Sequence, residues 1–284
     1  MSASVKHTHV WKVNGAAQSE QPDLLAREEP LEIRIVHGSA DNRIEKKLAV
    51  TMRTPGHDLE LALGFLFTEG IVGSYADVLN IRHCETVEKE EERDNVVKVE
   101  LAPSTPFDPE KLDRNFYTSS SCGVCGKSSI ESVSVACSYN IKNDTSVVTH
   151  QVILGLTNTV RKTQNVFEYT GGIHASGLFD LQGNLILSRE DVGRHNALDK
   201  IIGASLFKNE VPLTQRILLV SGRTSFELVQ KAARAGIPIL AAVGAPSSLA
   251  VDLAIENNMT LIGFLKFNRF NVYCGRERVR SSEI

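Results

Sequence analysis

RILLVSGRTSFELVQKAARAGIPILAAVGAPSSLAVDLAIENNMTLIGFL (216–265) is the stretch that decides the fold. Three short apolar runs alternate here with two helical patterns. The runs are Arg216–Ser221, Ile237–Val243 and Thr260–Leu265, and the helical patterns cover 224–235 and 247–257. Apolar strands that are joined through helices predict a parallel or mostly parallel sheet that is covered on both faces. The stretch therefore predicts an α/β protein.

The residues upstream of this stretch continue the alternation of helices and strands. They predict a helix at 149–162, a hairpin with strands at 173–180 and 184–189, and a helix at 191–208. We therefore expect residues 117–284 to form one α/β domain, which also carries a C-x-x-C loop.

A smaller α+β domain is predicted over residues 30–116. Alternating patterns indicate strands at Leu31–His37, Ile44–Arg53, Val78–Cys84 and Val96–Leu101, and Asp58 begins a helix that Gly70 ends. This β-β-α-β-β order resembles a small β-grasp-like roll. Residues 1–29 are polar and have no periodicity, so we expect a flexible arm there.

Composition excludes several classes of protein. The 284 residues carry a net charge of −3, which gives no electrostatic basis for binding nucleic acid or a membrane surface. No stretch has the roughly 20 apolar residues of a membrane span, and the N-terminus has no signal-peptide pattern. Five cysteines, three of them scattered, do not form a disulfide framework. We expect a cytoplasmic protein.

Cys122 and Cys125, in SCGVCGKSS, are the residues most indicative of chemistry. A dithiol–disulfide redox pair is one interpretation, although no βαβ unit precedes the motif. Structural zinc is a second, with Cys137 and His150 as the nearest further ligands. The third is nucleophilic sulfur chemistry, in which an exposed thiolate near Lys127 accepts sulfur as a persulfide.

Polar residues follow the ends of several predicted strands. His174 lies beside two glycines, and Asp191, Arg194 and His195 open a helix. Ser221 and Arg223 follow the next strand, Ser247 and Ser248 follow a third, and Lys266 and Arg269 follow the last. Ligands of open α/β sheets bind at carboxyl ends of strands, and helix N-termini favour anions. Since P-loop and dinucleotide fingerprints are absent from the sequence, we expect a nucleotide-bearing ligand held in another way.

Taken together, these motifs resemble the FdhD family, the formate dehydrogenase accessory sulfurtransferases. The resemblance runs from about Glu29 to Tyr273 and rests on EEPL, DLELALGFLFTEGI, CGVCG, TGGIHA, EDVGRHNALDK, SGRTSFE and the closing GF segment. It implies a sulfurtransferase that takes persulfide sulfur from a cysteine desulfurase. The acceptor it implies is the bis-molybdopterin guanine dinucleotide form of the molybdenum cofactor, which formate dehydrogenase needs. The family also implies a homodimer, a cytidine-deaminase-like three-layer fold for the larger domain, and no metal of the protein's own.

The resemblance assigns roles to individual residues. Cys122 would carry the persulfide, with Cys125 as its partner. The pocket for the guanine dinucleotide part of the cofactor would be lined by Phe264, Leu265, Lys266, Phe267, Asn268 and Arg269. Within it, Lys266 and Arg269 would face phosphate. Further pocket residues would be His174, Asp191, Arg194, His195, Ser221 and Arg223. The chain departs from its relatives at Phe267-Asn268, where a small or turn-forming residue is usual. A phenylalanine adopts the backbone angles that glycine allows only with steric strain, so the shape of the pocket here is in question.

Two other functions remain open at this point. A cofactor-binding chaperone would deliver the molybdenum cofactor without sulfur chemistry, and a zinc-stabilised protein would use the cysteines only for structure. Deamination is not implied, since the H-x-E and P-C-x-x-C motifs of zinc deaminases do not occur in the sequence.

Overall fold

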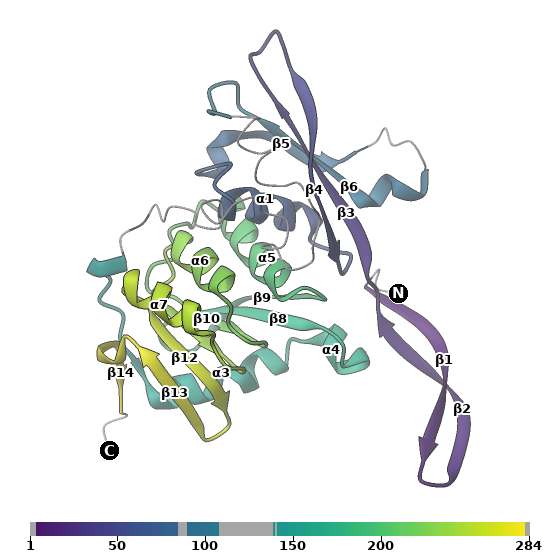
Figure 1. Cartoon of the computed structure of the whole chain (residues 1–284), viewed down its shortest axis with the longest axis vertical. Helices are drawn as coiled ribbons and strands as arrows, with labels where there is room; N and C mark the ends of the chain where they lie inside the picture. The colour runs from purple at the N-terminus through teal and green to yellow at the C-terminus, as the bar shows by residue number, and fades with distance from the viewer. Residues whose placement is uncertain (1–3, 85–89, 108–138, 140, 282–284) are drawn as a thin grey trace.

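A six-stranded sheet forms the centre of the structure, a computed structural model that describes residues 4–84, 90–107, 139 and 141–281 (Figure 1). Its strand order is β13-β12-β11-β10-β8-β9. The strands are β8 (His174–Phe179), β9 (Leu185–Asp191), β10 (Ile217–Val220), β11 (Ile239–Ala242), β12 (Thr260–Lys266) and β13 (Arg269–Cys274). The α/β class is confirmed.

The parallel part of this sheet is smaller than the sequence predicts. Only β10, β11 and β12 run parallel to one another, because α6 returns the chain from β10 to the start of β11 and α7 returns it from β11 to the start of β12. The strands β8, β9 and β13 are antiparallel to their neighbours. β13 was not predicted, and it follows β12 through a tight turn at residues 267–268.

Helices cover both faces of the large sheet (Figure 1). α3 (His150–Arg161) packs on one face with the apolar cluster that includes Ile153 and Phe179. α5 (Arg194–Phe207), α6 (Phe226–Arg234) and α7 (Ser248–Glu256) supply side chains to the cluster on the other face. Shorter elements complete this part: η4 (Ile141–Asn143), β7 (Val148–Thr149), α4 (Asn165–Thr170), η5 (Arg276–Arg278) and β14 (Val279–Arg280).

The predicted β-β-α-β-β order is confirmed in the first half of the chain. β3 (Glu29–His37), β4 (Ile44–Arg53), β5 (Val78–His83) and β6 (Val96–Leu101) form a sheet in the order β4-β3-β6-β5, with β3 and β6 parallel. α1 (Asp58–Thr68) lies between the second and third strands in sequence and contacts β5 and β6. Two short 3-10 helices, η1 (Tyr75–Asp77) and η2 (Glu90–Asn95), flank β5.

Residues 1–29, predicted to be a flexible arm, contain two strands that the sequence did not predict. β1 (Val5–Asn14) and β2 (Ala17–Ala26) form an antiparallel hairpin that projects from the body (Figure 1). Its cross-strand hydrogen bonds hold it although it buries little, and Trp11 remains 68% exposed. Apolar and polar residues alternate in a strand when one face of it is buried. An exposed hairpin therefore has no alternation by which its strands could be predicted.

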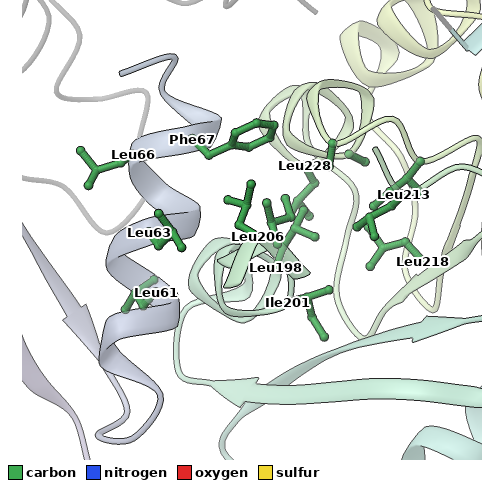
Figure 2. Packing of buried hydrophobic residues seen from close by; sticks show 14 of the residues in the cluster. Leu61, Leu63, Leu66, Phe67, Leu198, Ile201, Leu206, Leu213, Leu218 and Leu228 are labelled. Atoms are coloured by element: carbon green, nitrogen blue, oxygen red, sulfur yellow. The ribbon is translucent and has the colours of Figure 1, made fainter. Parts of the chain in front are cut away.

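One hydrophobic cluster runs from the small sheet through α1 to the helices of the large sheet. Figure 2 shows this packing, in which Phe67 of α1 reaches toward Leu228 of α6 and Leu206 of α5. α1 and α5 approach through reciprocal glycines: a Cβ on Gly64 would overlap the carbonyl oxygen of Asp199, and one on Gly203 would overlap that of Glu60. The two halves of the chain therefore share one core. The domain boundary between residues 116 and 117 lies outside the described residues.

Candidate functional site

A pocket of about 800 Å³ opens where β10, β11 and β12 end. One wall comes from α3 and α4, including Asn158, Arg161 and Phe167. The facing wall holds His174 at the start of β8, Ser221 after β10 and Lys266 at the end of β12. Apolar side chains such as Leu219 and Leu265 also line it. The pocket thus joins an apolar interior to polar strand ends, which is the usual composition of a small-molecule site.

The structure brings together four of the residues predicted for binding. These are His174, Ser221, Leu265 and Lys266, all of which line this pocket. They come from three strands that are separated by helices in the sequence. Ser221, Leu265 and Lys266 converge because carboxyl ends of parallel strands share one edge of the sheet. His174 lies at the same edge because β8 runs antiparallel to β10 and so begins there.

Glycines let the loops at this edge pack closely. Gly244 donates its N–H to the carbonyl of Gly222 (3.1 Å), and Phe264 donates to the carbonyl of Gly244 (3.0 Å). A Cβ on Gly244 would lie 2.9 Å from the Cα of Arg223, closer than real side chains come. The backbones that follow β10 and β11 and the last part of β12 therefore pack directly against one another.

Backbone strain lies at Phe264 and not at Phe267. Phe264 has φ of 53°, a left-handed conformation that is unusual for a bulky residue. It sits at a register shift between β12 and β13, and its ring is 42% exposed. Phe267 and Asn268 form the turn without positive φ, and Phe267 is 79% exposed. The expected strain at Phe267 is thus absent from the described turn, and the bulge carries it three residues earlier.

His174 and Arg194 meet beside Gly222. The Nδ1 atom of His174 lies 3.4 Å from the Oγ of Ser221. A Cβ on Gly222 would lie 3.4 Å from that same Nδ1 and 3.5 Å from the Cδ of Arg194. Burial lowers the pKa of His174, and the positive charge of Arg194 and the neighbouring His195 lower it further, against a smaller opposing effect of Asp191.

Asp191 and His195 do not line the pocket; both are held inside the fold. Asp191 is fully buried and forms an ion pair with Lys200 (2.7 Å between Oδ2 and Nζ). His195 is also buried, and its Nε2 lies 3.0 Å from a Glu227 carboxylate oxygen and 3.1 Å from the Oγ of Ser225. His195 lies in the first turn of a helix, as predicted, but Asp191, predicted to cap that helix, is the last residue of β9, and Gly193 takes the N-cap position. The sequence also could not reveal that Lys200 and Glu227 already pair with these two side chains.

Lys266 lines the pocket, and Arg269 is its cross-strand partner at the turn between β12 and β13. Arg223, Lys266, Phe267, Asn268 and Arg269 are exposed. The cations among them can contact an anionic group without first breaking a described ion pair. This arrangement is suited to phosphate groups in solvent-accessible positions.

The wall formed by α3 and α4 was missed by sequence reasoning. The guanidinium of Arg161 stacks over the ring of Phe167, 4.1 Å from its centroid. Glu190 holds α4 in place by accepting the N–H groups of Val166 (3.0 Å) and Phe167 (2.9 Å). The sequence did not indicate that α4 forms part of the pocket wall, because this helix is too short to show a helical pattern of apolar residues.

Cys122, Cys125 and Cys137 lie outside the described residues, so the structure does not test the three interpretations of the cysteine pair. Within the part of the chain that is described, no three His, Cys, Asp or Glu side chains gather as metal ligands would. Over the same residues, no helix has both the length and the apolar character needed to cross a bilayer.

Known proteins similar to this chain fall in one family. The FdhD/NarQ family model matches residues 26–280. A Streptomyces coelicolor protein named Sulfur carrier protein FdhD is 48% identical over 98% of this chain and 97% of its own length. A protein of the same name from Sulfurisphaera tokodaii is 41% identical over 97% and 99%.

A solved structure has the same fold. It is that of a candidate formate dehydrogenase accessory protein from Desulfotalea psychrophila, with a TM-score of 0.70, 23% identity, and coverage of 97% of this chain and 99% of that one.

Proposed function

Because this chain belongs to the FdhD/NarQ family, we propose that it is a sulfur carrier that serves the maturation of a formate dehydrogenase. Sulfur would reach Cys122 from a cysteine desulfurase and would pass to the bis-molybdopterin guanine dinucleotide form of the molybdenum cofactor, the substrate of the transfer. The protein would work in the cytoplasm as a homodimer.

The observation that supports cofactor binding in this proposal is the pocket at the strand ends. It combines an aromatic and apolar wall, with Phe167 and Leu265, with the exposed cation Lys266. A second exposed cation, Arg269, is the cross-strand partner of Lys266 at the turn between β12 and β13. A guanine nucleotide has the same two-part chemistry, with a flat base and an anionic diphosphate. We assign the base to the α3–α4 wall and the phosphates to the β12–β13 turn.

The chemistry of the first step needs only an accessible thiolate. The Cys122 thiolate would attack the outer sulfur of a cysteine persulfide on the desulfurase. A new sulfur–sulfur bond forms on Cys122, the donor's sulfur–sulfur bond breaks, and the donor cysteine leaves as a thiolate. This exchange needs no external oxidant or reductant. In the later release, the Cys125 thiolate would attack the inner sulfur of Cys122, the outer sulfur would leave at the hydrosulfide level, and a cellular thiol would reduce the resulting Cys122–Cys125 disulfide.

The test is mass spectrometry after incubation with a cysteine desulfurase and cysteine. We expect one added sulfur atom on the peptide that holds Cys122 and Cys125, removable by a thiol reductant. The Cys122→Ala variant should lose the added sulfur and should not restore formate dehydrogenase activity in cells that lack this protein. A Cys274→Ala variant is the matched control and should behave as the wild type does.

A cofactor-binding chaperone is the second candidate, and the pocket itself supports it equally. It predicts that Cys122→Ala restores formate dehydrogenase activity in full, whereas Lys266→Ala does not. Absence of added sulfur on the wild type, with a desulfurase that is active on a control acceptor, would reject the sulfur-carrier proposal.

A further inference from the structure

The wall of the pocket formed by α3 and α4 contains a buried amide that has no partner. Gln164 lines the pocket and is only 7% exposed. Its backbone groups are used, since its N–H donates to the carbonyl of Arg161 (3.4 Å) and its carbonyl accepts the N–H of Glu168 (3.0 Å). Its side chain makes no hydrogen bond with any residue that the structure describes. Buried side-chain amides usually have partners, so this one calls for an explanation.

Helix capping does not explain the amide. Gln164 is the N-cap residue of α4, a position from which a side chain often accepts an N–H of the first turn. Here the carboxylate of Glu190 on β9 does this instead, and accepts the N–H groups of Val166 (3.0 Å) and Phe167 (2.9 Å). The start of α4 therefore does not need the side chain of Gln164.

The amide is accessible from the pocket. Neither of its polar atoms is among the unpaired atoms that the described protein encloses completely, although the residue as a whole is buried. Because Gln164 lines the pocket, the remaining access to its Nε2 and Oε1 comes from that side. The wall thus offers a ligand one donor and one acceptor, side by side in one plane.

A neutral, flat group suits this position better than a phosphate does. No carboxylate and no cation other than Arg161 lies on the described part of this wall, and the guanidinium of Arg161 stacks over the ring of Phe167. An anion buried against a neutral amide would lose hydration without gaining a charged partner. The exposed Lys266, on the facing wall, is the better partner for phosphate.

We propose that Gln164 recognises the guanine base of the cofactor through two parallel hydrogen bonds. Its Nε2 donates to the carbonyl oxygen of guanine, and its Oε1 accepts the adjacent ring N–H. Guanine carries this acceptor and donor next to each other on one edge, as the amide does. The inference rests on the proposed function and deepens it, because it assigns recognition of the base to one side chain.

The chemistry of an amide also defines a test that the fold cannot imitate. An amide that turns over presents its donor and acceptor in the reverse order, which fits adenine. A carboxylate only accepts, so it matches the ring N–H and amino group of guanine but repels the ring nitrogen acceptor of adenine. Gln164→Glu should therefore change the base preference of the pocket.

The experiment is calorimetry of the full chain with guanosine diphosphate and adenosine diphosphate as probes. Gln164→Met keeps the length of the side chain and removes its donor and acceptor. We expect it to bind guanosine diphosphate about tenfold more weakly than the wild type does. Its midpoint of thermal unfolding without nucleotide should not fall, since the amide holds no described hydrogen bond. Gln182→Met, in the turn at the other end of β8, is the matched control and should bind as the wild type does.

Gln164→Glu is measured with both probes at mildly alkaline pH, where the new carboxyl is ionised. We expect the ratio of guanosine diphosphate affinity to adenosine diphosphate affinity to rise about tenfold over that of the wild type. Repulsion between the carboxylate and the diphosphate is common to both probes, so it cancels in the ratio. A residue with only a structural role would leave this ratio unchanged.

Equal affinities of the wild type and Gln164→Met for guanosine diphosphate, or an unchanged ratio in Gln164→Glu, would overturn the inference. So would a wild type that binds no guanosine diphosphate. If the nucleotides bind as expected but Cys122 never gains sulfur, the role of Gln164 stands and the sulfur-carrier proposal fails. If Cys122 gains sulfur and Gln164→Met binds as the wild type does, the proposed function stands and this inference fails.

Discussion

The helical seam and the edge of the pocket at the strand ends differ in whether their charged side chains are paired. We define the seam as Gly64, Thr68, Asp199, Gly203 and Lys231, where α1, α5 and α6 meet. Lys231 is buried there, and its ammonium contacts both oxygens of Asp199 (2.9 and 2.8 Å) and the hydroxyl of Thr68 (2.8 Å). Burial by itself would lower the pKa of Lys231, yet the charge of Asp199 raises it above its usual value.

At the edge of the pocket, the Nε of Arg194 is buried without a described partner, Lys266 and Arg269 face solvent, and Phe264 has a strained backbone. The two regions therefore use their charged side chains differently: the seam uses them to stabilise the fold, and the pocket edge leaves them available to a ligand. The seam satisfies its charges and contributes stability; the edge leaves its donors unsatisfied and holds strain, which is typical of sites that await a ligand. Substitutions in the two regions should therefore have different consequences.

Lys231→Met should give the largest effect, because it leaves the carboxylate of Asp199 buried and unpaired. We expect a loss of about 3–5 kcal/mol in the free energy of unfolding, measured by urea denaturation. Adding Asp199→Leu should recover much of that loss, since a buried pair replaced as a whole is often tolerated. A loss below about 1 kcal/mol would show that water reaches Asp199 and Lys231 as it reaches surface ion pairs. The seam and the pocket edge would then not differ in the way described.

Glu60 of α1, whose backbone lies against Gly203 of the seam, makes the stability of this region sensitive to acid. It accepts both arms of the Arg189 guanidinium, at 2.6 and 2.7 Å, and its pKa is lowered to about 2. Although burial opposes this shift, Arg189 and His57 outweigh it. Stability from a lowered carboxyl pKa is present above the unfolded value of 4.5 and is lost as the pH falls toward about 2.

The full shift corresponds to about 3 kcal/mol as an upper estimate. Glu60→Gln should lower stability at pH 7 and should flatten the dependence of stability on pH between these two values. An unchanged acid profile in Glu60→Gln would contradict the assignment.

Gly203→Ala tests the close approach of α1 and α5. The new methyl would overlap the carbonyl oxygen of Glu60, so the helices must separate. We expect a loss of about 1–3 kcal/mol, read from thermal or urea unfolding. Gly155→Ala on α3 is the control: it has nothing within 4 Å of the added carbon, and it should gain about 0.5–1 kcal/mol from helix propensity. Equal effects at the two positions would reject close packing as the cause.

Phe264→Gly should have the smallest effect on stability, and in the opposite direction. Glycine relieves the positive φ, while the exposed ring gives up little burial. We expect no loss, or a gain of up to about 1 kcal/mol. Leu265→Ala, one residue on and 1% exposed, should lose about 2–5 kcal/mol. A clear loss in Phe264→Gly would show that the ring is part of the core and not of the pocket edge.

Sequence patterns predicted the elements that are buried. β6 matches its predicted range and is mostly buried, as expected where a strand enters the core. β4 also matches its predicted range, although most of its residues are exposed or partly exposed. The hairpin of β1 and β2 and the edge strand β13 have mostly exposed or partly exposed residues, so their sequences lack that constraint. Their pairing is visible only in three dimensions.

The site residues that could be predicted are those that directly follow a strand, because the order of strands and helices determines where they lie. Ser221 and Lys266 follow strands, so topology brings them to one edge. Whether a charge there is free depends on contacts far away in the sequence, as Asp191 shows by its pairing with Lys200. The Arg161–Phe167 wall was missed for the same reason, since nothing local indicates that a surface arginine faces a pocket.

The most direct test of this account is calorimetry of guanosine diphosphate binding to the wild type and to Lys266→Ala. We expect saturable binding to the wild type and at least tenfold weaker binding to the variant, with the midpoint of thermal unfolding unchanged in the absence of nucleotide. Binding that is absent, or that Lys266→Ala leaves intact, would mean that the unpaired charges at the strand ends are ordinary surface and do not form a nucleotide site.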